Sequence, residues 1–99
     1  MLLPHAITLA QARSYLAALA DQAPTLEASA AYERTLIDLD RLHGDESPAL
    51  TTDGLTHDRE ILYATASSAI EALTAHGVDA LGVELILAML EDAHGLDVP

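Results

Sequence analysis

Apolar residues recur at helical spacing near the start of the chain, and a helix-breaking residue follows them. Thr8 and, three residues later, Gln11 form the pattern of a capping box. Pro24 then interrupts the periodicity. A first helix is therefore predicted over residues 9–22, with one apolar stripe formed by Leu9, Ala12, Leu16 and Leu19.

A second helical pattern begins after Thr25, whose hydroxyl suits an N-cap, and stops at Gly44, which suits a helix end. It predicts a helix over residues 26–43. The apolar stripe of this helix consists of Tyr32, Leu36, Leu39 and His43. The opposite side carries charged residues at spacings of four and three, at which helical side chains meet, so we expect it to be solvated. These residues are Arg34, Asp38 and Arg41.

The segment 44–55 lacks helical periodicity and gathers two glycines, one proline, three acids and three hydroxyl residues. We interpret it as a surface crossover between two helical hairpins. A third helix is predicted over residues 57–76, starting at Thr56 or Asp58. Its apolar stripe consists of Leu62, Ala66, Ala69 and Leu73, and a separate row of small residues consists of Ala64, Ser68 and Ala72. That row either permits close approach of a neighbouring backbone or reflects the abundance of alanine.

The turn after the third helix is the best specified of the chain. Gly77 suits the left-handed position of a Schellman motif, in which Val78 would contact Leu73. Asp79 suits the N-cap of a fourth helix, predicted over residues 80–94.

The fourth helix is apolar around most of its circumference, which is typical of a buried helix. It is therefore either central in one chain or partly covered by a second copy, and we favour a homodimer. The expected interface residues are Leu81, Leu85, Ile86, Leu87, Met89 and Leu90.

These elements predict an all-α fold, a four-helix bundle built from two antiparallel helical hairpins, as a single domain over residues 1–99. Composition agrees, because 19 alanines and 18 leucines dominate the apolar residues while phenylalanine and tryptophan are absent. No segment alternates apolar and polar residues for long, so no sheet is expected.

Sixteen acidic residues stand against four arginines and no lysine, so the formal net charge is −12. This charge argues against nucleic acid as a partner, because phosphate groups would be repelled. It serves either solubility or attraction of a basic protein. The absence of cysteine, of a secretory signal pattern and of a membrane-length apolar run predicts a soluble cytoplasmic protein without membrane contact.

Three helices are predicted to end in His-Gly, at residues 43–44, 76–77 and 94–95, and we interpret these pairs as C-terminal caps. Asp40 with His43, and Glu91 with His94, also have the spacing of metal ligands in helical bundles. A di-iron bundle would need further carboxylates on the apolar stripes of the first and third helices, which offer none. We therefore expect no metal and no cofactor.

Catalysis is disfavoured by the same sequence. It contains no nucleophile-elbow motif and no glycine-rich phosphate loop, and no serine stands in a recognisable arrangement with a base. No catalytic residue is assigned.

The run Gly77-Val-Asp-Ala-Leu-Gly-Val-Glu-Leu85, continuing through Leu90-Glu91 to 95–99, resembles the second helix of acyl carrier proteins. In that family a serine after the aspartate carries phosphopantetheine. The matching residue here is Ala80, which has no hydroxyl to modify. This sequence also has one residue fewer than the family between the elements 79–81 and 83–85. The resemblance therefore does not imply carrier function.

From these patterns we expect a small acidic module for protein–protein interaction, a regulator, inhibitor or accessory subunit without catalytic activity. One alternative is a bundle that binds a small ligand or a metal, with His43, His94 and their acidic neighbours as candidate ligands. Another is a degenerate carrier-like domain.

Overall fold

The computed structural model describes residues 1–44 and 47–97. Within them the chain forms four α-helices and one short 3-10 helix, and no strand. The elements are α1 (Leu3–Asp21), α2 (Leu26–Leu42), α3 (Arg59–Ala72), η1 (Leu73–His76) and α4 (Ala80–Asp97). No helix of this described part is long and apolar enough to cross a membrane.

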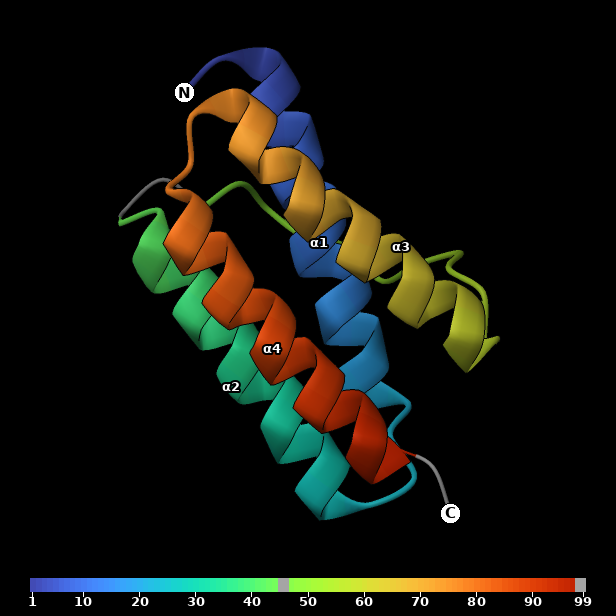
Figure 1. The fold of residues 1–99 in the computed structure, drawn as a ribbon. Coiled ribbons are helices and arrows are strands. Elements are labelled where there is room, and N and C mark those ends of the chain that lie inside the picture. The colour runs from blue at the N-terminus through green and yellow to red at the C-terminus, as the bar shows by residue number, and fades with distance from the viewer. Residues whose placement is uncertain (45–46, 98–99) are drawn as a thin grey trace.

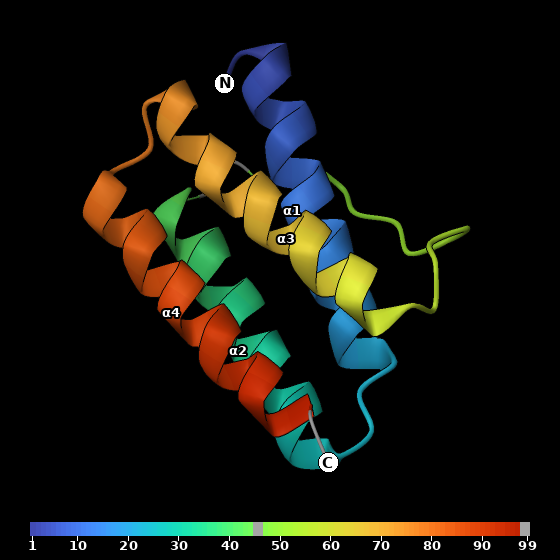
Figure 2. The same ribbon diagram turned by 45° about the vertical axis from the view of Figure 1, so that its right-hand side comes forward.

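The helices form a four-helix bundle of two antiparallel hairpins, as the sequence predicts (Figure 1). Helices α1 and α4 run in one direction, and α2 and α3 in the other, as Figures 1 and 2 show. Each helix packs against two neighbours, so that α1 contacts α2 and α3, while α4 contacts the same two helices from the other side. The first hairpin, α1–α2, thus contacts the second, α3–α4, in two places: α2 packs against α4, and α1 packs against α3.

The core consists of apolar side chains that the four helices direct inward. Tyr32 is the largest of the fully buried side chains. Small alanines between the leucines let the helices approach closely. The fully buried leucines and isoleucine are Leu9, Leu16, Leu19, Leu39, Leu62, Ile70, Leu73 and Leu90.

The crossover between α2 and α3 runs along α1, to which its backbone is hydrogen-bonded (Figure 2). The Arg13 guanidinium donates to the carbonyl of Pro48 and also pairs with Asp40 of α2, whose Oδ1 lies 2.8 Å from the Arg13 Nε. The backbone amide of Thr51 donates to the hydroxyl of Ser14 over 3.1 Å. The connection is thus fixed to the bundle at Pro48 and Thr51, and Arg13 joins α1, α2 and this connection.

The start of α1 differs from the sequence prediction. The helix begins at Leu3, six residues before the predicted start, and Pro4 occupies its first turn, where a missing N–H costs nothing. Thr8 lies inside the helix and donates its hydroxyl proton to the Pro4 carbonyl over 3.1 Å, so the capping box is wrong. Exposed apolar residues such as Ile7 hide this turn from a periodicity analysis.

The starts of α2 and α3 are capped by two predicted residues. The Thr25 hydroxyl accepts a hydrogen bond from the Ala28 amide over 3.1 Å. Asp58, one of the two predicted starts, accepts hydrogen bonds from the amides of Glu60 and Ile61. The predicted third helix covers both α3 and η1, because its last turn tightens into a 3-10 helix.

The turn at residues 77–79 has the predicted geometry. Gly77 adopts φ of 87°, and the Val78 amide donates to the Leu73 carbonyl over 3.3 Å, as in a Schellman motif. The Asp79 carboxylate accepts from the Gly82 amide over 3.0 Å and caps α4.

The C-terminal end of α4 corrects a second prediction. The helix continues through Gly95 to Asp97, so the expected His-Gly cap at 94–95 is wrong. The imidazole of His94 instead stacks on the ring of Tyr63, with centroids 3.9 Å apart. The carboxylate of Asp97 is anchored by the guanidinium of Arg59, which holds the last turn in helical conformation.

The other two His-Gly pairs do end helices. Gly44 and Gly77 have φ of 64° and 87°, the left-handed conformation that glycine adopts without strain. His43 also caps α2 through its side chain, since its Nδ1 donates to the Leu39 carbonyl over 2.9 Å.

Candidate functional site

The structure divides the six interface residues that the sequence predicts on α4. Ile86 and Leu90 are buried in the core of the chain itself, with 4% and 1% of their surface exposed, and Leu87 packs against that core. These three side chains stabilise the bundle, and Ile86 also lines a hollow between α2 and α4. They lie on the helix face directed at α2 and α3.

The remaining part of the set forms an apolar stripe on the outer side of α4. Leu81 and Leu85 expose 64% and 60% of their surface, and Met89 is partly exposed. Positions 81, 85 and 89 are one helical turn apart, so these side chains lie above one another. The apolar circumference of α4 thus has one face in the core and another at the surface.

Beside this stripe, a groove lies between α2 and α4, two helices that run side by side (Figure 1). It contains a hollow of about 370 Å³ and an adjoining one of about 170 Å³, which share Met89 as a lining residue. The larger hollow is lined by Asp38, Arg41, Leu42, Gly82, Leu85, Ile86 and Met89. The smaller one is lined by Ala31, Arg34, Met89, Asp92, Ala93 and Leu96.

The charges along this α2–α4 groove balance each other. Arg34 and Arg41 stand against Asp38 and Asp92, so the whole formal charge of −12 lies elsewhere on the molecule. Arg41 lies 3.4 Å from Asp38 in an exposed ion pair. Within the described residues no ion pair or hydrogen bond involves the Arg34 side chain, which is exposed to solvent. The groove is therefore an apolar strip with a neutral rim on a strongly acidic protein.

The two arginines outside the groove serve the fold. Arg13 holds the crossover, and Arg59 pairs with Asp97, a carboxylate whose side chain is only 5% exposed, at 2.8 Å. Asp97 also accepts the hydroxyl proton of Tyr32 over 2.7 Å. Burial and, secondarily, this hydrogen bond raise the pKa of Tyr32 well above its ordinary value. The Arg59–Asp97–Tyr32 network joins α3, α4 and α2 at one end of the bundle.

The two predicted carboxylate–histidine pairs have other partners in the structure. Asp40 is bound by Arg13, whereas His43 binds the backbone of its own helix. His94 stacks on a tyrosine, and its Nε2 lies 3.5 Å from the exposed Glu60 carboxylate. In the described part of the chain, no group of three or more His, Cys, Asp or Glu side chains could hold a metal ion.

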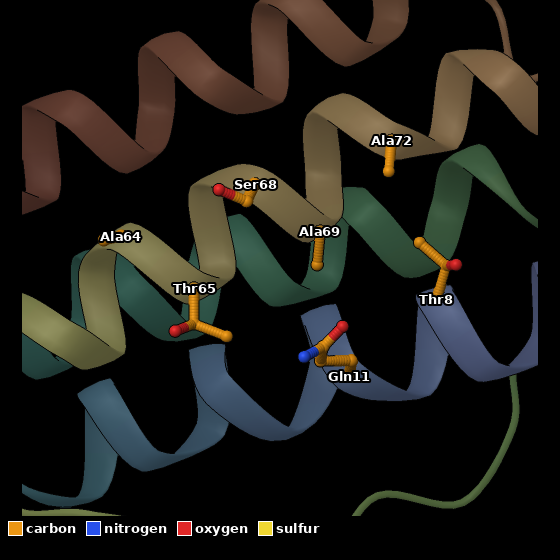
Figure 3. Close-up of a pocket in the computed structure, with 7 residues that line it drawn as sticks. All are labelled: Thr8, Gln11, Ala64, Thr65, Ser68, Ala69 and Ala72. Atoms are coloured by element: carbon orange, nitrogen blue, oxygen red, sulfur yellow. The ribbon is translucent and has the colours of Figure 1, made fainter.

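Another hollow, of about 340 Å³, lies at the seam between α1 and α3 (Figure 3). Its lining residues are Thr8, Gln11, Ala64, Thr65, Ser68, Ala69 and Ala72. The predicted row of small side chains, Ala64, Ser68 and Ala72, lines this hollow, and all three residues are exposed. Hydroxyl and amide groups can bind a polar molecule weakly, but no lining residue is an acid or a base at neutral pH.

Three histidines that are far apart in the sequence meet at the end of the bundle where α1 begins. The Nε2 atoms of His5 and His43 lie 3.2 Å apart, and the rings of His5 and His76 are stacked with centroids 5.4 Å apart. Sequence spacing on a single helix could not reveal this cluster, because its members come from α1, the end of α2 and η1.

Comparison with models of known protein families, with curated protein sequences and with solved structures yields no match to this chain.

Proposed function

We propose that this protein is a non-catalytic protein-interaction module that works as a homodimer, joined through the α2–α4 groove. The observation that carries the proposal is the exposed apolar stripe of Leu81 and Leu85, which borders the groove. Exposed apolar surface next to a hollow is typical of a surface that a partner covers.

The charge distribution favours a second copy as the partner in this groove. Two copies of a protein with a net charge of −12 repel each other over most approaches. The groove is the exception, because its acidic and basic residues cancel. In a twofold contact each surface meets itself, so Arg34 or Arg41 of one copy can face an acidic residue of the other.

A basic partner would be attracted by other surfaces of the same molecule. All the excess negative charge lies outside the groove, so it remains exposed when the groove is covered. We propose that this acidic remainder attracts a basic segment of another protein, as a small regulator or accessory subunit would. Dimerisation would double the number of acidic surfaces in one particle and so strengthen binding to a partner with several basic segments.

The proposal is tested by substituting one groove residue and one matched residue elsewhere. Leu85→Glu places a charge at the groove, and Ile61→Glu does the same on α3, where Ile61 exposes a similar 52% of its surface. Losing Leu85 from both copies removes about 2–4 kcal/mol of apolar burial, which corresponds to a roughly 30- to 700-fold weaker dimer.

Light scattering over a dilution series in the micromolar range measures the mass. We expect a dimer for the parent protein and for Ile61→Glu, and a monomer for Leu85→Glu with an unchanged helical spectrum. A monomeric parent at all concentrations would contradict the proposal, as would equal weakening by both substitutions.

A further inference from the structure

The two hollows of the α2–α4 groove carry matching sets of charges. The larger hollow is lined by Asp38 and Arg41, both on α2. The smaller hollow is lined by Arg34 on α2 and Asp92 on α4. Met89 lines both hollows, so it lies where they adjoin. The groove thus has two parts on either side of Met89, and each part contains one positive and one negative side chain.

The charged side chains of the two hollows differ in their partners within the chain. Arg41 pairs with Asp38 over 3.4 Å, and its side chain is 78% exposed. Arg34 and Asp92 are both exposed and line the same hollow, yet within the described residues neither side chain has an ion pair or a hydrogen bond. These two side chains can therefore pair with another molecule without breaking a contact in their own chain.

Exposed apolar residues lie beside these charges on both helices. The stripe of α4 continues past Met89 to Leu96, which exposes 39% of its surface, because positions 89, 92 and 96 follow one another at helical spacings of three and four. On α2, Ile37 exposes 51% of its surface and lies between Arg34 and Arg41 at the same spacings. The apolar surface thus extends along both hollows.

We propose that the twofold axis of the dimer passes close to Met89, so that the larger hollow of each copy faces the smaller hollow of the other. This inference rests on the dimer proposed above and specifies its register. A twofold rotation exchanges the two sides of its axis. Arg41 of each copy then meets Asp92 of the other copy. Asp38 of each copy likewise meets Arg34, and symmetry forms each of these pairs twice.

An axis at the larger hollow would also balance the charges, because Arg41 would then face Asp38 of the other copy. Two observations favour the axis at Met89. It covers both hollows and the apolar stripe as far as Leu96, and it pairs the two charges of the smaller hollow that have no ion pair within the described chain. Ion pairs that the dimer covers are also screened less by salt than the repulsion between exposed acidic surfaces.

The test uses two variants, each of which reverses the charges of one hollow. Asp38→Arg combined with Arg41→Asp reverses the larger hollow, and Arg34→Asp combined with Asp92→Arg reverses the smaller one. Both variants keep the net charge of −12. In the proposed register, each variant alone places like charges opposite each other at all four contacts. We therefore expect its dimer to be at least about tenfold weaker than that of the parent.

An equimolar mixture of the two variants should dimerise again. In the mixed dimer the two reversed hollows face each other, and so do the two unchanged ones, so all four ion pairs are restored. Light scattering over a dilution series should therefore show dimers in the mixture, and also for a single chain that carries all four substitutions. The helical spectrum of each variant is recorded alongside.

Cross-linking of chains with unchanged charges tests the register even if a charge-reversed variant fails to fold. Along α4, residue 96 lies about 10 Å from the proposed axis on one side, and residue 85 lies about 6 Å from it on the other. Leu96→Cys should therefore react through a short bis-maleimide with Leu85→Cys of the other copy. It should not react with a second Leu96→Cys, because these two positions are about 21 Å apart along the helix.

The outcomes separate the register from the dimer itself. A parent that stays monomeric contradicts the proposed dimer and, with it, the register. The register alone is overturned if the parent dimerises and each charge-reversed variant dimerises equally well by itself. It is also overturned if a mixture of the folded variants stays monomeric, or if position 96 does not cross-link to position 85.

Discussion

Removing the carboxylate of Asp97 should destabilise the bundle by about 3 kcal/mol, because it breaks a buried ion pair and leaves its partners behind. In Asp97→Ala, the Arg59 guanidinium loses three contacts shorter than 3 Å, and Tyr32 loses the acceptor of its hydroxyl proton. Arg59 is one-quarter exposed, so water can partly solvate the remaining charge, which places the cost at the lower end of the range for broken buried pairs. A small domain has only about 5–15 kcal/mol of stability in total, so the effect is large.

The matched control is Asp38→Ala, which breaks the surface pair with Arg41. The Arg41 side chain is 78% exposed and the atoms are 3.4 Å apart, so this pair should contribute less than about 1 kcal/mol. The comparison separates the effect of burial from that of losing one negative charge.

Urea unfolding at pH 7, followed by circular dichroism at one fixed protein concentration, measures both variants. With a slope of about 2 kcal/mol per molar urea, the Asp97→Ala midpoint should fall by about 1.5 M and the Asp38→Ala midpoint by less than about 0.5 M. Equal shifts for the two variants would refute the reasoning. A double variant that also replaces Arg59 with methionine should recover part of the loss, since no charge then stays buried without a partner.

The raised pKa of Tyr32 predicts that the free energy of unfolding is unaffected by this group below pH 10, the ordinary tyrosine pKa, and falls above it, because the unfolded chain ionises first. Alkaline urea melts should show that fall, and Tyr32→Phe should reduce it; a parallel pH profile for this variant would count against the assignment. Gly77→Ala and Asp79→Ala should each cost about 1 kcal/mol in the same melts, the first through the left-handed φ of 87° and the second through the lost cap. Unchanged midpoints for both would mean that the α3–α4 turn is wrongly described. Raising NaCl from about 0.1 to 1 M should tighten the dimer, because the Debye length falls from about 10 to about 3 Å and the two copies, which carry the same net charge, then repel each other less. Weaker association at high salt would contradict the proposed neutral interface.

Local signals in the sequence predicted the fold, and long-range contacts limited what could be predicted of the sites. Thr25, Asp58 and the 77–79 turn act through neighbours a few residues away, so their roles follow from the sequence. The start of α1 was missed because Pro4 and exposed apolar residues carry no periodic signal.

Interactions between residues far apart in the sequence leave no local pattern from which they could be predicted. The extension of α4 past Gly95 depends on Arg59, 38 residues before Asp97, and His5 meets His43 across the same separation. The six apolar residues predicted as an interface on α4 could be named from the sequence, but their division into core and surface required the positions of α2 and α3.

The most direct test of the central claim, self-association through the α2–α4 groove, uses the absence of cysteine from the sequence. A single Leu85→Cys substitution introduces one thiol beside the groove, and Ile61→Cys introduces one at a similarly exposed position on α3. In a twofold contact, residues near the axis lie close to their own copies. Treated with a short bis-maleimide at micromolar concentration, Leu85→Cys should form a covalent dimer rapidly while Ile61→Cys stays monomeric. Equal cross-linking of the two variants, or none at position 85, would contradict the account.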